Sequence, residues 1–369
     1  KGIFWYYFEH NERPAVVYAM SDTPFKKITP NNCNGYQFRI SYYGYSIVAD
    51  FFHAICDGTG AGEFMKSLLY SYFNLLGLNV NSDNKVLTVN SPIDPAEIED
   101  SFLRYYRPIR LRDAKLGELQ GAKAYKLDGI LTPNNGNCII NMYCDSKSLL
   151  ELARSKSCTI TELLAATLVL SIYETQIKDK RPDAEDIVLF MPINLRKIFP
   201  SITLRNFTLF CRARANPKTD MQLEKLISII HNALAKDTDR ENLTQKISTT
   251  VKGEKFVPLR ILPLVFKTLI FKITNLWGKN KKTMTLSNIG VFKMPEDMKQ
   301  HIRSTSFGIN ANPFAPSTLT IATTYDTCSM SFVRCITSTA IEKRFAEYLT
   351  SMGLKLSLTS NFWEVDYAL

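Results

Sequence analysis

Only one of the four histidines in the sequence lies in a setting suited to proton transfer. His53 follows the apolar run 45–52 and directly precedes the segment 54–75, whose apolar residues recur at helical spacing. Loops after strands are where folds of strands and helices place reactive groups. An imidazole is the natural general base near neutral pH, because it can take a proton from an attacking hydroxyl or amine and return it to a leaving thiolate. The sequence therefore predicts His53 as a catalytic base.

The other histidines lie in settings typical of structural or solvated side chains. His10 is surrounded by acidic residues, His231 follows two isoleucines in a helical stretch, and His301 follows Lys299-Gln300. No two of the eight cysteines form a C-x-x-C pair. We therefore expect no metal site, and reduced thiols in a cytoplasmic protein.

Asp57 lies four residues after His53 and is followed by Gly58. One interpretation is that Asp57 is the N-cap of the next helix. The other is that its carboxylate pairs with a distant arginine and fixes the loop. The residues alone leave both open. Gly58 permits close approach, and its N–H is a candidate donor to an oxyanion.

Periodicity predicts the elements around this loop. The aromatic and β-branched run 35–43, Gly44 and the run 45–49 indicate a hairpin. Apolar residues at helical spacing predict a helix after Asp57 that ends at Gly77. The polar stretch 79–118 is interpreted as a crossover between two lobes.

The second lobe is predicted to begin near residue 121. Strands are expected at 137–143, 186–191, 318–325 and 330–335, and helices after the capping box Thr159–Glu162 and at 338–349. This irregular alternation favours α/β or α+β two-layer sandwiches over a barrel. We assign residues 1–118 to an N-terminal lobe with the crossover, and residues 119–369 to a C-terminal lobe.

The formal net charge of +10 has two interpretations. It provides solubility, or it attracts a polyanionic partner such as a phosphorylated cofactor, an acidic carrier protein or a membrane surface. Nucleic acid is disfavoured, because no run of five or six Lys or Arg occurs.

Two stretches bear on the setting of the chain. The apolar segment 256–277 is interrupted by lysines, and a buried helix with snorkelling lysines is favoured over a membrane-surface helix. The chain begins at Lys1 in an aromatic stretch, so we expect a fragment whose N-terminal piece precedes it.

The order His-x-x-x-Asp-Gly after an apolar strand resembles the signature of the chloramphenicol acetyltransferase-like superfamily. This group includes plant BAHD acyltransferases, condensation domains of peptide synthetases and bacterial alcohol acetyltransferase-like proteins. Its usual form is His-His-x-x-x-Asp-Gly, and Phe52 replaces the first histidine here. The second histidine is the catalytic one in the superfamily, which corresponds to His53.

Two further segments extend this resemblance. The segments 191–196 and 204–207 resemble the second-lobe strand and the Asn motif of the superfamily, which implies that Arg196 pairs with Asp57. Taken alone, Arg196 would be an exposed arginine at a strand end. Residues 285–290 resemble the Ser-Asn-x-Gly strand of the bacterial alcohol acetyltransferase-like branch. Ser287 and Asn288 are then donors near the acyl oxygen, or they satisfy their own turn. The plant Asp-Phe-Gly-Trp-Gly motif is absent.

The resemblance implies two similar lobes with a central tunnel and His53 at its middle. It also implies that the first strand and helix of the N-terminal lobe precede Lys1. It implies an acyltransferase that uses acyl-CoA as co-substrate, an alcohol or amine acceptor, and no tightly bound cofactor. Lys279, Lys281 and Lys282 are a candidate contact patch for a phosphate-bearing donor. Peripheral contact with a membrane or a carrier protein is compatible with the charge.

Three alternatives compete with this interpretation. A carrier-protein thioester replaces CoA in condensation domains, and a relative that has kept only the fold would be a non-catalytic binding protein. A serine or cysteine hydrolase is disfavoured, because no Gly-x-Ser-x-Gly motif occurs and Cys56 is expected to point away from His53.

Overall fold

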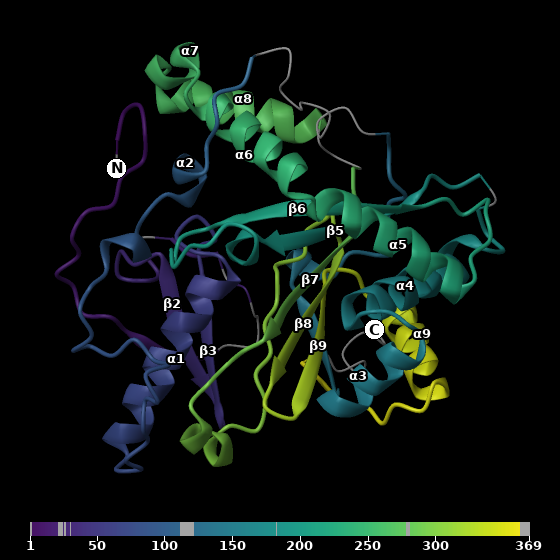
Figure 1. The fold of residues 1–369 in the computed structure, drawn as a ribbon, viewed down its shortest axis with the longest axis horizontal. Helices are drawn as coiled ribbons and strands as arrows, with labels where there is room; N and C mark the ends of the chain where they lie inside the picture. Colours follow the sequence, from purple (N-terminus) through teal and green to yellow (C-terminus); the bar gives the residue numbers. More distant parts are fainter. Residues whose placement is uncertain are drawn as a thin grey trace.

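The computed structural model describes residues 2–20, 25, 27–29, 31–110, 122–181, 183–277 and 281–361. Within these ranges the strands form two separate sheets with helices packed around them (Figure 1). The small sheet has the order β1-β2-β3, and the large sheet has the order β10-β4-β9-β8-β7-β5-β6. The predicted α/β class is confirmed, and neither sheet closes into a barrel among the described strands.

The small sheet leads into the loop that carries His53. It consists of β1 (Val17–Ala19), β2 (Phe38–Tyr43) and β3 (Ser46–Phe51). Tyr43 pairs with Ser46 across a two-residue turn in which Gly44 has a φ of +53°. Glycine adopts this left-handed conformation without the clash that a Cβ would cause. The predicted hairpin is confirmed.

Helix α1 (Gly58–Leu75) follows the loop at once. It begins after Asp57, and the chain leaves it at Gly77, which has a φ of +80°. Phe64 packs against two phenylalanine rings of the small sheet. The predicted helix and both of its ends are confirmed.

The crossover after α1 contains two short helices, η1 (Pro95–Glu97) and α2 (Ser101–Arg104). Residues 111–118 of the predicted crossover lie outside the described residues. The Leu204 N–H donates to the Glu97 carbonyl (2.7 Å), and the Thr203 hydroxyl donates to the Glu99 carbonyl (2.6 Å). The crossover thereby supports the segment 203–207.

The large sheet mixes parallel and antiparallel pairs. Its strands are β4 (Cys138–Asp145), β5 (Ile187–Asn194), β6 (Thr208–Ala215), β7 (Met284–Val291), β8 (Ser317–Thr324), β9 (Thr327–Arg334) and β10 (Ser357–Ser360). β7 is parallel to its neighbours β5 and β8, whereas the other pairs are antiparallel. The strands predicted from the sequence are confirmed as β4, β5, β8 and β9.

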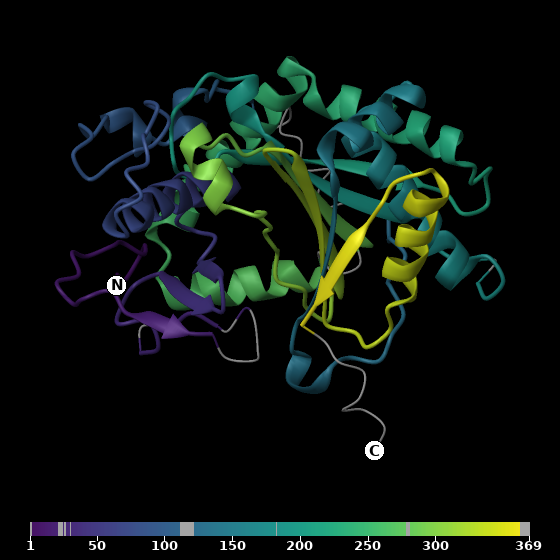
Figure 2. The same ribbon diagram turned by 90° about the horizontal axis from the view of Figure 1, so that it is seen from below.

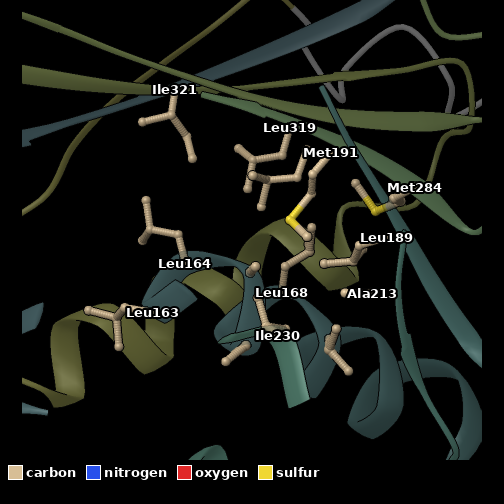
Figure 3. Close-up of a cluster of buried hydrophobic side chains, with 14 of the residues drawn as sticks. Leu163, Leu164, Leu168, Leu189, Met191, Ala213, Ile230, Met284, Leu319 and Ile321 are labelled. Atoms are coloured by element: carbon tan, nitrogen blue, oxygen red, sulfur yellow. The ribbon is translucent and has the colours of Figure 1, made fainter. Parts of the chain in front are cut away.

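One face of the large sheet packs on a layer of helices and forms the hydrophobic core. The helices are α3 (Ser146–Ser155), α4 (Ile160–Ile172) with its π-helical extension η5 (Tyr173–Ile177), α5 (Leu223–Thr238) and α9 (Ala340–Ser351). The predicted capping box of Thr159 and Glu162 starts α4. Figure 3 shows Leu164 and Leu168 of α4 facing the side chains of the strands.

The central helix of this layer also has the composition of a membrane span. Among the described residues, only 160–177 is long and apolar enough to cross a membrane, and 72% of it is buried inside the protein. Because it packs in the core between the sheet and the other helices, its apolar composition is explained by that packing.

The other face of the large sheet carries small polar side chains. Met284, Leu286, Leu319 and Ile321 belong to the core, and successive side chains of a strand point to opposite faces. The intervening residues, Thr285, Ser287, Thr318 and Thr320, therefore point away from the core helices, and all are buried. Figure 2 shows α9 on one side of the sheet and α1 and α8 on the other. The polar face is thus turned toward α1.

The segment 256–277 differs from the predicted buried helix. It forms α7 (Val257–Ile261) and α8 (Leu264–Trp277), which are separated at Pro263. Val265, Phe266 and Leu269 of α8 are exposed. The preceding helix, α6 (Arg240–Glu254), instead packs its apolar residues into the core.

Lys267 of α8 is buried, with 2% of its surface exposed, which is the reverse of snorkelling. Its ammonium donates to the Phe4 carbonyl (2.6 Å) and lies over the Trp5 ring. These contacts stabilise a cation away from water. The prediction of a buried helix with snorkelling lysines is therefore wrong for α8, because Phe4 and Trp5 cover the lysine while the apolar side chains of the helix stay exposed.

The position of Leu168 in the core predicts a stability effect. Leu168→Ala leaves a cavity among well-packed side chains, so we expect unfolding to become easier by about 2–5 kcal/mol. Leu150→Ala is the matched control, because Leu150 is 37% exposed on α3 and its truncation leaves no enclosed cavity. Thermal unfolding followed by circular dichroism measures both, and equal losses would contradict this assignment of the core.

Candidate active site

The loop after β3 is held by the backbone on both sides of His53. The Phe52 N–H donates to the Gln37 carbonyl (2.9 Å), and the Ile55 N–H donates to the Phe52 carbonyl (3.0 Å). The His53 side chain is exposed. No described residue forms a hydrogen bond with its imidazole. The ring nitrogens are therefore accessible to an external hydroxyl or amine.

Asp57 closes the loop and uses both of its carboxylate oxygens. The residue is 3% exposed. Its Oδ1 accepts the N–H groups of Thr59 (3.0 Å) and Gly60 (3.2 Å), which is an N-cap of α1. Its Oδ2 accepts the Phe207 N–H (3.0 Å) and a guanidinium N–H of Arg196 (2.7 Å). The two interpretations of Asp57, helix cap and ion-pair partner, therefore both hold.

Arg196 meets Asp57 in a bidentate pair. Nη1 donates to Oδ2, and Nη2 donates to Oδ1 at 3.3 Å. Nε and Nη2 also donate to the Thr203 carbonyl (3.0 and 2.8 Å), and Nη2 donates to the Arg205 carbonyl (2.6 Å). A buried ion pair is stable only when its remaining hydrogen-bonding groups are satisfied, as they are here. The arginine is buried and paired, so the interpretation of an exposed arginine at a strand end is wrong.

Two residues that the sequence argument did not single out complete this junction. The Asn194 amide oxygen accepts the Arg196 N–H (3.0 Å), and its nitrogen donates to the Thr59 hydroxyl (3.1 Å), which links the end of β5 to α1. Gly60 lies so close to Leu204 that a Cβ would be 2.1 Å from the Leu204 carbonyl oxygen. In the sequence, Asn194 and Gly60 lie close to the motif residues Arg196 and Asp57, but nothing there indicates which residues they contact.

Strand β7 places its middle next to the start of α1. A Cβ on Gly58 would lie 3.2 Å from a methyl carbon of Ile289. Ser287, two residues earlier on β7, points away from the core helices and is 7% exposed. No described residue forms a hydrogen bond with its hydroxyl. The Gly58 N–H likewise has no acceptor in the described chain. Two polar hydrogens thus lie unused near the loop.

Asn288 lies on the other side of β7 from Ser287. Its amide donates to the Thr161 hydroxyl (2.9 Å) at the start of α4 and accepts the Gly290 N–H (2.8 Å) within a β-bulge. The side chain therefore holds the strand to the core helices. The structure turns Ser287 to the face of β7 that looks toward α1 and turns Asn288 to the core helices.

Cys56 is the thiol nearest to His53 in the sequence. Burial, followed by the charge of Asp57, raises its pKa to about 11. A thiol that stays protonated at neutral pH is a poor nucleophile. In the described part of the chain, moreover, no three His, Cys, Asp or Glu side chains gather in a group that could hold a metal ion.

No family model and no curated protein matches the sequence. Solved structures do match the fold. TRI3 trichothecene 15-O-acetyltransferase from Fusarium sporotrichioides superposes with a TM-score of 0.51 and 12% identity, over 85% of this chain and 69% of that one. The nonribosomal peptide synthetase FmoA3 superposes with a TM-score of 0.57 and 12% identity, over 94% of this chain and 37% of that one. The chain has the chloramphenicol acetyltransferase-like fold.

The predicted fold is therefore confirmed. SgcC5 from Streptomyces globisporus also superposes, with a TM-score of 0.50 and 13% identity, over 86% of this chain and 71% of that one. Identities this low establish the fold alone. Membership of the bacterial alcohol acetyltransferase-like branch stays a prediction, as do the lobe boundaries and the central tunnel of the chloramphenicol acetyltransferase-like fold.

The junction at Gly60 predicts a contrast between two glycines in helices. Gly60→Ala forces a Cβ against the Leu204 carbonyl, so we expect a lower midpoint of thermal unfolding and a separation of α1 from segment 203–207. Gly253→Ala in α6 is the control, because no atom lies within 4 Å of the added Cβ and alanine stabilises helices by roughly 0.5–1 kcal/mol over glycine. A Gly60→Ala protein as stable as Gly253→Ala would contradict the close contact.

Proposed function

We propose that this chain is an acyltransferase that moves an acyl group, expected to be acetyl, from a CoA thioester to an alcohol or amine, with His53 as the general base. The observation that carries the proposal is the Asp57–Arg196 junction. It fixes the loop on the C-terminal side of His53, and the hydrogen bond from the Phe52 N–H to the Gln37 carbonyl holds the other side, while the imidazole itself stays exposed. A base that must reach substrate is best held through its backbone, because its own side chain has to stay available.

The proposed reaction is direct attack in a ternary complex. His53 accepts the proton of the acceptor O–H or N–H as the acceptor oxygen or nitrogen forms a bond to the thioester carbonyl carbon. The carbonyl oxygen becomes an oxyanion in the tetrahedral intermediate. Collapse of this intermediate breaks the carbon–sulfur bond, and the imidazolium returns its proton to the leaving thiolate.

The oxyanion is assigned to the two unused donors near the loop. These are the Gly58 N–H, at the N-terminal end of α1, and the Ser287 hydroxyl. The start of a helix favours negative charge, because its backbone N–H groups and dipole point toward it. Asp57 acts in this scheme as a positioning residue, since its carboxylate is already satisfied by α1, Phe207 and Arg196.

The likeness to known enzymes supports acyl transfer. TRI3 is described as an O-acetyltransferase, and FmoA3 as a nonribosomal peptide synthetase. The second makes a carrier-protein thioester the competing donor. With either donor, the proposed reaction needs no tightly bound cofactor. We propose that it takes place in the cytoplasm.

His53→Ala tests the base directly. We expect acyl transfer to fall by about 10²–10⁴-fold, because no other imidazole takes the proton. Thiol release from acetyl-CoA, with a panel of alcohols and amines, measures the rate. His10→Ala is the control that removes an exposed imidazole elsewhere. Unchanged turnover in His53→Ala would refute the assignment, and thiol release that is independent of any acceptor would indicate a thioesterase.

Arg196→Lys tests the junction without removing its charge. An ammonium cannot hold both oxygens of Asp57 and the carbonyls of Thr203 and Arg205 together. We expect the turnover number to fall by roughly tenfold or more with little change in KM, because the loop shifts while the substrate sites remain. Arg344→Lys, which alters the Arg344–Glu174 pair of α9, is the matched control. Equal losses in the two variants would mean that Arg196 serves stability alone.

A further inference from the structure

Helix α8 exposes a continuous row of apolar side chains at the edge of the molecule (Figure 1). Each of these side chains is between 42% and 77% exposed, and their spacing places them on one face of the helix. We call them the apolar face, which consists of Val265, Phe266, Leu269 and Ile270. The preceding helix, α7, adds Val257 and Ile261, which are 64% and 68% exposed.

The opposite side of α8 is covered by the N-terminal segment. The Leu264 N–H donates to the Ile3 carbonyl (2.8 Å), and the buried Lys267 ammonium donates to the Phe4 carbonyl (2.6 Å). An amphipathic helix of a folded domain normally packs its apolar side inward. Helix α8 does the reverse, because its lysine is inside and its aliphatic and aromatic side chains are outside. Contiguous exposed apolar side chains mark a surface that meets a partner or a membrane.

Exposed aromatic residues lie beside the apolar face. The N-terminal segment that contacts α8 also contains Tyr6 and Phe8, which are 77% and 72% exposed. Trp5, whose ring lies against the Lys267 ammonium, is 43% exposed. Tyrosine and tryptophan favour the boundary between water and lipid, because each combines an apolar ring with a polar group. The N-terminal segment therefore adds side chains of this type to the same region.

The charge around the apolar face has one sign. The stretch 255–295 contains eight Lys and Arg residues and no Asp or Glu. Arg260 of α7 and Lys272 of α8 are exposed, and neither forms a salt bridge with a described acidic residue. Lys272 follows Leu269 by three residues, which makes the two side chains neighbours on the helix surface. The apolar face is therefore accompanied by cations that lack a carboxylate in the described chain.

The lysines predicted from the sequence as a contact patch for a phosphate-bearing donor follow α8. Lys279 lies outside the described residues. The Lys282 ammonium donates to the Thr285 hydroxyl (3.2 Å) and lies over the Phe190 ring, so it is turned toward the large sheet. Contact of this patch with a donor stays a prediction, and the apolar face does not include it.

The charge and the length of α8 select among the occupants of the apolar face. A second copy of the chain is disfavoured, because a symmetric contact would bring the same cations together. A helix of 14 residues is about 21 Å long, which is shorter than the roughly 30 Å hydrocarbon core of a bilayer. Helix α8 therefore suits a position along a membrane surface, where apolar side chains enter lipid and cations meet anionic headgroups.

We propose that α7 and α8 dock the protein on a membrane that contains anionic phospholipids. Phe266 and Leu269 enter the boundary between headgroups and acyl chains, and Arg260 and Lys272 contact the phosphates. This inference goes beyond the proposed acyl transfer and does not depend on it, because membrane binding requires no substrate.

Co-sedimentation of the full chain with vesicles tests this surface. We expect binding to vesicles of phosphatidylcholine with phosphatidylserine, and weaker binding to phosphatidylcholine alone. High salt should remove the difference, because it screens the charges. Phe266→Gln with Leu269→Gln should lower the affinity for both vesicles by about tenfold or more, because two apolar side chains no longer enter lipid. Leu75→Gln with Leu76→Gln is the matched control, since it removes two exposed leucines at the end of α1.

Arg260→Gln with Lys272→Gln tests the electrostatic part of the binding. Each cation near an anionic surface contributes about fivefold to the affinity, so we expect binding to phosphatidylserine vesicles to weaken by roughly 25-fold. Binding to phosphatidylcholine alone should change little. Lys147→Gln with Lys343→Gln is the control, because it removes two exposed charges from α3 and α9 of the core helix layer.

The absence of binding to either vesicle would overturn the proposal, as would losses no larger than those of the two control variants. Light scattering without lipid tests the competing occupant. A wild-type dimer that becomes a monomer in Phe266→Gln with Leu269→Gln would assign the apolar face to a second copy and overturn membrane docking. A monomer that binds phosphatidylserine vesicles and loses this binding in both double variants supports it.

Discussion

The buried pair of Asp57 and Arg196 is the interaction on which the arrangement of this chain depends, because it joins the loop after the small sheet to the large-sheet lobe. Removing two charges from water is unfavourable unless the surrounding groups replace the lost hydration. Here one carboxylate receives N–H groups from α1 and from Phe207, and one guanidinium reaches two backbone carbonyls. Hydrogen bonds from the protein thus replace those that water would make to each charge. The loop of His53 takes its position from both lobes.

The large sheet divides its two faces between stability and chemistry. The face toward α3, α4, α5 and α9 carries the aliphatic core and supplies the stability of the lobe. The other face carries hydroxyl groups and is turned toward α1. β7 is central to this division. Its Asn288 fixes the strand to the helix layer, which leaves Ser287 to face the loop.

Features set by local sequence were predictable, and features set by distant contacts were not. The hairpin at Gly44, the helix after Asp57 and the capping box at Thr159 each follow from a few adjacent residues. The pair with Arg196 came from resemblance, since no spacing rule links two residues 139 positions apart. The burial of Lys267 was not predictable, because it depends on Phe4 and Trp5, which are more than 250 residues away in the sequence, packing against α8. Nor was the need for glycine at position 60, which follows from the approach of Leu204.

The net charge of +10 is divided among cations in different settings. Most of the cations whose contacts are described have a carboxylate, a carbonyl or open water beside them, and such charges contribute mainly to solubility. Lys282 differs, because it is half-buried and the described chain provides no carboxylate for it. The Thr285 hydroxyl and the Phe190 ring are the partners of its ammonium instead. The total charge is therefore distributed mainly among ion pairs and exposed side chains, with Lys282 held by a hydroxyl and an aromatic ring.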